Sequence, residues 1–176
     1  EEVLLLDPEH ERAKGQIALI YAERLVQLEG ALDGGNLAEA EFLIEELSKK
    51  IPRNTRLEAL STRFQTRMQV GRILKSTFLL MDANGLDDES IAAAATQSLQ
   101  EVLRLDPENM GALEGLNQIS ELYSRKSMEA SNEGRLDEAI QFLERASLAN
   151  PLNKNLDSAR ALVARAETEQ GTIESL

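Results

Sequence analysis

The segment Val102-Leu103-Arg104-Leu105-Asp106-Pro107-Glu108 repeats, at an offset of 99 residues, the segment Val3-Leu4-Leu5-Leu6-Asp7-Pro8-Glu9. The offset holds without a gap between residues 3–57 and 102–156, where 18 of 55 positions are identical. Phrases of this kind contain all four prolines, Pro8, Pro52, Pro107 and Pro151, at spacings of 44, 55 and 44. Self-similarity with a period of tens of residues is typical of stacked-repeat proteins, which usually work by presenting an extended surface. The internal duplication therefore predicts a binding or scaffolding protein.

Between the prolines, apolar residues recur every three or four positions, which is the period of an α-helix. The longest apolar stripe runs from Leu57 to Met81 and predicts one unbroken helix of about 27 residues. Gly-containing segments such as 33–36 and 84–88 interrupt the periodicity and predict turns. The pattern predicts an all-α fold of about seven helices, long and short in alternation, near residues 11–32, 37–51, 57–81, 91–105, 113–130, 136–146 and 156–166.

The composition narrows the classes of function. The net charge of −12 opposes nucleic-acid binding, because that binding needs Lys and Arg to neutralise phosphates. The chain has no Cys, no apolar run of about 18 residues and no signal-peptide pattern. We therefore expect no nucleic-acid partner and no membrane insertion by this segment. We also expect residues 1–176 to form one continuous domain of a larger protein, because Glu1 to Asp7 correspond to the end of a helix in the second copy.

The chain resembles the tetratricopeptide repeat (TPR), a helix-turn-helix unit of about 34 residues with small or aromatic residues at fixed positions. The copy that ends at Pro151 is the most specific, and only Lys126 departs from its pattern. The matching residues are Tyr123, Ser127, Ala130, Ala139, Leu143 and Ala146. The proline spacings exceed the family's period by 10 and 21 residues, so we expect lengthened first helices of about 22 to 28 residues. The resemblance implies an α-solenoid of antiparallel helix pairs.

The resemblance also implies which residues would line a groove. They are Ala22, Leu25, Glu29 and Leu32 in one repeat and Glu121, Ser124, Met128 and Ser131 in another. Chaperone-binding members of the family carry Lys and Asn at these positions to clamp a carboxylate, and those donors are missing here. Among these residues, Met128 is the one we expect to contact a protein or peptide partner.

A basic run stands out in this acidic chain. It comprises Arg53, Arg56, Arg63, Arg67, Arg72 and Lys75 and is interrupted only by Glu58. Arg56, Arg63 and Arg67 fall within about 40° of one another on a helix, so they could form a rail for an acidic peptide. The alternative is that they pair with the acidic helix that carries Glu39, Glu41, Glu45 and Glu46.

The same long helix carries apolar residues outside its main stripe. Val70, Ile73, Leu79 and Leu80 indicate a helix that is apolar on more than one side. Such a helix is either buried between neighbours or exposed to a partner. The second possibility predicts a homodimer through Phe78, Leu79 and Leu80.

Catalytic signals are missing from the sequence. His10 is the only His and lies between Glu9 and Glu11 at a predicted helix start. The sequence offers no second His and no Cys to act with it as a general base or a metal ligand. No Ser has a His or Cys partner to activate it, and Gly34-Gly35 lacks the Lys-Ser or Lys-Thr of a phosphate loop. We therefore expect no enzyme activity, no catalytic residue, no metal site and no cofactor.

These observations favour a protein-interaction scaffold built from TPR-like repeats. Two alternatives stay open: a structural spacer or homodimerisation module, and a small-ligand sensor whose ligand would need a closed apolar cavity. The Leu-Asp-Pro-Glu phrases followed by long helices also resemble repeat segments of membrane-anchored bacterial proteins. That resemblance implies a bacterial protein with this segment in the periplasm, whereas the residues themselves indicate no compartment.

Overall fold

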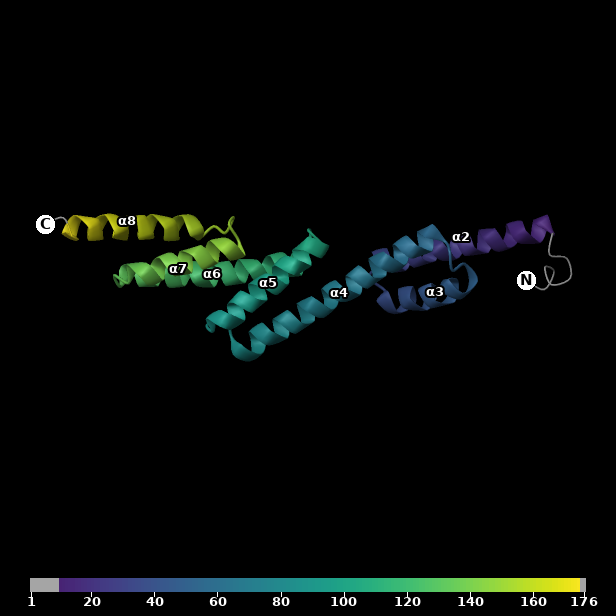
Figure 1. Cartoon of the computed structure of the whole chain (residues 1–176), viewed down its shortest axis with the longest axis horizontal. Helices are drawn as coiled ribbons and strands as arrows, with labels where there is room; N and C mark the ends of the chain where they lie inside the picture. Colours follow the sequence, from purple (N-terminus) through teal and green to yellow (C-terminus); the bar gives the residue numbers. More distant parts are fainter. Residues whose placement is uncertain (1–9, 175–176) are drawn as a thin grey trace. The chain divides into compact units, whose positions relative to one another are not determined.

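The computed structural model describes residues 10–174, and within this range the chain is entirely helical (Figure 1). It contains seven helices and no strand in the described range, which confirms the all-α prediction. The long and short helices alternate as predicted along the first six elements. Their bounds are α2 (Glu11–Asp33), α3 (Leu37–Lys50), α4 (Thr55–Asn84), α5 (Glu89–Leu105), α6 (Met110–Asn132), α7 (Leu136–Ala149) and α8 (Leu156–Glu174).

The chain divides into two compact units whose boundary, between Gln69 and Val70, falls inside α4. Each unit has its own apolar core, as expected for segments that bury separate helix faces. The prediction that residues 1–176 form one continuous array stays a prediction. We call residues up to 69 unit 1 and residues from 70 onward unit 2.

Unit 1 consists of α2, α3 and the first half of α4 (Figure 1). Its core is built mainly from leucines at the helical period, which is the pattern that the sequence predicts for one buried face. The buried members of this core are Leu25, Leu28, Ala31, Leu32, Ala40, Leu43, Leu47, Leu57, Leu60 and Phe64.

Unit 2 contains the second half of α4 and all of α5 to α8. Helix α6 lies at its centre and packs against α5, α7 and α8, most extensively against α7. Three buried serines on α6 accompany its apolar residues, and two of them bond to α7. Ser127 Oγ donates to the Ala139 carbonyl at 2.7 Å, and Ser120 Oγ donates to the Ala146 carbonyl at 2.8 Å.

The prolines produce one recurring turn. In each described case the Asn two residues after the proline donates its backbone N–H to the carbonyl of the residue before the proline, at 3.1 to 3.2 Å. A proline with a fixed φ suits the second position of such a turn. The side chain of the same Asn then accepts a backbone N–H at the start of the following helix. These pairs are Asn54 with Leu57, Asn109 with Ala112 and Asn153 with Asn155.

The turns inside the two helix pairs are also equivalent. Gly35 and Gly134 have φ values of 72° and 75°, a conformation that favours glycine. The residue after each glycine bonds back to the helix: Asn36 N–H donates to the Ala31 carbonyl at 2.8 Å, and Arg135 N–H donates to the Ala130 carbonyl at 2.9 Å. Helices α2 and α3 begin and end 99 residues before α6 and α7, so the duplication in the sequence is also a duplication of helix bounds.

Candidate functional site

The three arginines of the predicted basic rail all contact helix α2 within unit 1. Arg56 pairs with Glu29 and Arg63 pairs with Asp33, each with an N–O distance of 2.5 Å. Arg67 donates to the Leu32 carbonyl near the end of α2, where the helix dipole favours a cation. The alternative pairing with the acidic residues of α3 was therefore wrong about the partner helix, because this face of α4 meets the last turns of α2.

The residues that the TPR resemblance places in a groove are mostly not open to solvent. Leu25, Leu32 and Ser124 are buried in the unit cores, while Met128 and Glu29 are half-buried. Leu25 and Leu32 belong to the core that α2 forms with α3 and α4 in unit 1, whereas Ser124 lies on α6, which packs against α5, α7 and α8 in unit 2. Partner binding by Met128 stays a prediction.

The residues predicted for self-association differ in their exposure. Leu79 is largely exposed, Phe78 is about one third exposed, and Leu80 is half-buried. Phe78 packs against Gly115 of α6. The Phe78 Cε1 atom lies 3.4 Å from the position that a Cβ atom would have on that glycine. The exposed part of this surface therefore centres on Leu79.

His10, the only His, accepts the Ala13 N–H at 3.2 Å and acts as the N-cap of α2.

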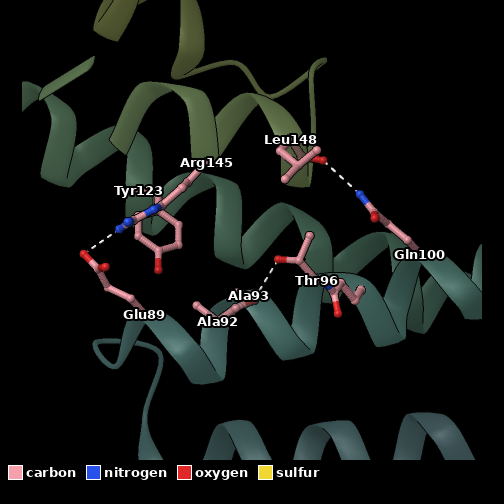
Figure 2. A pocket seen from close by; sticks show the side chains of 9 residues that line it. Glu89, Ala92, Ala93, Thr96, Gln100, Tyr123, Arg145 and Leu148 are labelled. Carbon is pink, nitrogen blue, oxygen red and sulfur yellow. Dashed lines mark hydrogen bonds and ion pairs between the residues drawn. The ribbon is translucent and has the colours of Figure 1, made fainter. Parts of the chain in front are cut away.

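A cavity that the sequence did not predict lies in unit 2 between α5, α6 and α7. It has a volume of about 110 Å³ (Figure 2). Alanines form its α5 wall, and polar groups stand at two sides of it. The lining residues are Glu89, Ala92, Ala93, Thr96, Gln97, Gln100, Tyr123, Arg145 and Leu148.

Tyr123 of α6 is the most deeply buried polar group at this cavity, with 2% of its surface exposed. Its hydroxyl has no hydrogen-bond partner among the residues that the structure describes. In Figure 2 this hydroxyl points toward α5, between Glu89 and Ala92. Burial raises the pKa of the Tyr123 phenol, so the group stays protonated and keeps a proton to donate.

Arg145 of α7 borders the cavity beside Tyr123. Its guanidinium carbon lies 5.7 Å from the centre of the Tyr123 ring and 5.8 Å from that of Phe142. The Lys126 ammonium lies 5.8 Å from the Tyr123 ring centre and also pairs with Asp87 at 3.0 Å. Two cations thus flank one pair of stacked aromatic rings, whose centres are 6.0 Å apart.

Glu89 of α5 lies against Arg145, with 2.5 Å between its carboxylate oxygen and Nη1. This contact with Arg145 lowers the pKa of the Glu89 carboxyl and raises that of the guanidinium. The Glu89 side chain remains 55% exposed, so it can leave the cation for solvent at small cost.

Local sequence features hold α5 at the cavity. Asp88 caps α5 by accepting the backbone N–H groups of Ser90 and Ile91. The hydrogen bond from the Ser90 hydroxyl is the main cause that lowers the pKa of the Asp88 carboxyl. The Thr96 hydroxyl donates a hydrogen bond to the Ala92 carbonyl at 2.8 Å. Gln100 donates its side-chain amide to the Leu148 carbonyl at 3.0 Å and joins α5 to α7 at the far side of the cavity.

Close approach of α5 to α6 depends on Gly115. A Cβ at this position would stand 2.8 Å from Leu99 Cδ1, closer than real Cβ atoms come. The leucine of α5 therefore occupies the space that a side chain on α6 would fill.

Among the side chains that the structure describes, no group of three or more His, Asp or Glu residues is placed to hold a metal ion. No helix in the described part of the chain is both long and apolar enough to cross a membrane. Comparison with protein-family models, curated protein sequences and solved structures finds no match to this chain.

The cavity residues could have been noticed from the duplication. Tyr123 replaces Arg24 of the first copy, Arg145 replaces Glu46, and Leu148 replaces Lys49. Each exchange reverses or removes a charge at one repeat position. Positions at which two copies of a repeat differ in charge are therefore the signal that would have predicted a site in the second copy.

Proposed function

We propose that the chain is a protein-interaction module built from TPR-like helical repeats. The observation that carries the proposal is a cluster of exposed apolar side chains at one end of unit 2. This apolar end comprises Met110 and Leu113 at the start of α6 together with Leu152 in the turn after α7. Leu152 has 89% of its surface exposed, and exposed apolar side chains that lie together often mark a protein-interaction site.

The helix arrangement puts these residues at the same end. Helices α6 and α7 are joined by a short turn and run antiparallel, so the start of α6 meets the end of α7. Hydrogen bonds tie this end together, because Asn117 Oδ1 accepts from the side chains of Asn150 at 3.1 Å and Asn153 at 2.8 Å. Apolar residues on a support of this kind resemble the centre of a protein interface.

The TPR resemblance receives support from one packing contact. The family's pattern places small residues where its two helices cross, and here Ser127 of α6 meets Ala139 of α7. Both residues are fully buried. The lengths of α2 and α6, at 23 residues each, agree with the first helices of about 22 to 28 residues that the proline spacings predict, and α4 is longer still at 30 residues.

The test is selection of peptides from a random display library on the purified chain, followed by calorimetry with the selected peptides. A double variant, Met110→Glu with Leu152→Glu, should weaken peptide binding about tenfold or more, since it charges the centre of the surface. The matched control, Val26→Glu with Phe42→Glu, charges two exposed apolar residues of unit 1. Equal binding by the two variants, or selection of no peptide, would contradict the proposal.

Self-association is the second candidate, and the exposure of Leu79 favours it. A homodimer through this surface would give a mass that rises with concentration in light scattering, and Leu79→Glu would abolish the rise. A constant monomer mass over the whole concentration range would rule it out.

A further inference from the structure

The cavity between α5, α6 and α7 has the size and the donors for a small ligand. We propose that it binds a carboxylate carried on a short apolar stem, with the Arg145 guanidinium and the Tyr123 hydroxyl as hydrogen-bond donors. This inference does not rest on the proposed protein-interaction function, because neither Met110 nor Leu152 lines the cavity.

The volume limits the ligand to a few atoms. An apolar cavity of about 150 Å³ accommodates benzene, which has six carbon atoms. At about 110 Å³, the cavity has room for roughly four to five heavy atoms on the same scale. Propionate has that size, as does the end of a glutamate side chain.

The lining separates apolar walls from polar donors. The methyl groups of Ala92 and Ala93 and the side chain of Leu148 offer contacts for carbon atoms of a stem. Tyr123 places a buried hydroxyl without a partner at the same cavity. An oxygen atom of a ligand that accepts this proton would satisfy a group that the described protein leaves unsatisfied.

Charge favours a carboxylate over a neutral acceptor. Arg145 offers a planar set of N–H donors that suits a carboxylate, and Lys126 adds a second cation beside the Tyr123 ring. Two carboxylates, Glu89 on Arg145 and Asp87 on Lys126, balance these cations. The Glu89 carboxylate therefore already occupies Arg145, the proposed donor to the ligand. A bound ligand carboxylate would replace Glu89 at Arg145, and the Glu89 side chain would turn to solvent.

The first copy of the duplication lacks this chemistry. The positions of Tyr123 and Arg145 are occupied there by Arg24 and Glu46. The site is thus a property of the second copy rather than of the repeat.

Two sources can supply the ligand: a free short-chain acid, or a glutamate side chain of a partner. The probes for the first source are sodium propionate and sodium butyrate, with propionamide as the neutral control of equal shape. The probes for the second are a short capped peptide with one glutamate and the same peptide with glutamine. Binding is followed by amide chemical shifts of the isotope-labelled full chain.

We expect saturable shifts around Ala92, Ala93 and Tyr123, with propionate at least about tenfold tighter than propionamide because its bonds are charge-assisted. Saturation by propionate assigns a free acid, and saturation by the glutamate peptide alone assigns a protein partner. Arg145→Gln and Tyr123→Phe should each weaken binding about tenfold. Glu89→Gln should tighten binding about threefold, because it removes an exposed competing carboxylate.

A matched pair of variants keeps the test independent of folding. Ala93 and Ala94 are adjacent exposed alanines of α5, but only Ala93 lines the cavity. Ala93→Leu should abolish binding by filling the space, while Ala94→Leu should bind as the unmodified chain does. Equal binding by these two variants, equal affinity for propionate and propionamide, or no saturation with any probe would overturn the proposal.

Discussion

Helices α2 and α3 of unit 1 and helices α6 and α7 of unit 2 have the same lengths and the same glycine turn, yet their buried contacts differ in kind. Leu28 of α2 and Ser127 of α6 occupy equivalent positions, and both are fully buried. Leu28 fills space with an apolar side chain, whereas Ser127 lets α7 approach and bonds its Ala139 carbonyl. One repeat pattern therefore supports two ways of packing a helix pair.

The two pairs also differ in what covers them. Ile20 of α2 is 53% exposed, while its equivalent Ile119 of α6 is fully buried. In unit 2, α5 packs against α6 and covers that face. The cavity lies between α5, α6 and α7. The comparison teaches that function in this chain should be sought where the second copy departs from the first.

Breaking the apolar contact in unit 1 should have the largest effect. Leu28→Ala deletes most of a fully buried side chain and leaves a cavity, so we expect the free energy of unfolding to fall by about 3 kcal/mol. Urea denaturation followed by circular dichroism measures the loss. Ser127→Ala is the matched change in unit 2 and should cost about 1 kcal/mol, the value of one hydrogen bond. Similar losses for both variants would show that the two contacts are not different in kind.

Transferring the first copy's residue into the second should also destabilise the chain. Ser127→Leu places in α6 the residue that α2 has at this position, but the serine site lies against the α7 backbone. We expect a loss of about 2 kcal/mol from overpacking and from the lost bond to Ala139. The reverse change, Leu28→Ser, should cost more than Leu28→Ala, because it buries a hydroxyl. A stable Ser127→Leu variant would mean that the helix separation adapts to the side chain.

The sequence predicted the helices well because their ends depend on local chemistry. Pro52, Pro107 and Pro151 each stop a helix, and Gly35 and Gly134 adopt the conformation that a tight helix turn requires. All these signals act within a few residues of the bond that they control. The bounds next to these prolines and glycines could therefore be placed to within a few residues, whereas α8 extends to Glu174, eight residues beyond the predicted end.

The contacts between helices were harder to predict. The spacing of Arg56, Arg63 and Arg67 showed that they share a face, but not that this face meets α2 rather than α3. The cavity was missed for the same reason, since it depends on how closely Leu99 approaches Gly115. Periodicity shows which residues lie together on one helix, whereas the choice of neighbour depends on packing in three dimensions.

Removing the unpaired hydroxyl at the cavity should stabilise unit 2 slightly. Tyr123→Phe keeps the ring contacts and deletes a buried group that lacks a partner, so we expect a gain of roughly 1 kcal/mol in the free energy of unfolding. The raised pKa of Tyr123 means that the folded state holds the phenol proton more tightly. Stability should therefore fall as pH rises above about 10, and less steeply in the variant.

A loss of stability in Tyr123→Phe at pH 7 would indicate that the Tyr123 hydroxyl has a hydrogen-bond partner in solution. Arg24→Met, the change at the equivalent position of α2, controls for a general effect of removing a polar group.

The ion pair at the cavity should give the smallest effect, visible only through its pH dependence. Because contact with Arg145 lowers the pKa of Glu89, the folded state releases this proton more readily than the unfolded state. The resulting stability is present above the unfolded pKa and is lost as pH falls through the folded pKa, so the unmodified chain should weaken between about pH 5 and pH 3. Glu89→Gln should show a shallower decline in its urea midpoint over this range, while Glu41→Gln on exposed α3 should follow the unmodified chain. Parallel declines in all three proteins would mean that Glu89 leaves Arg145 in solution, and the guanidinium would then be free for a ligand without displacement of any carboxylate.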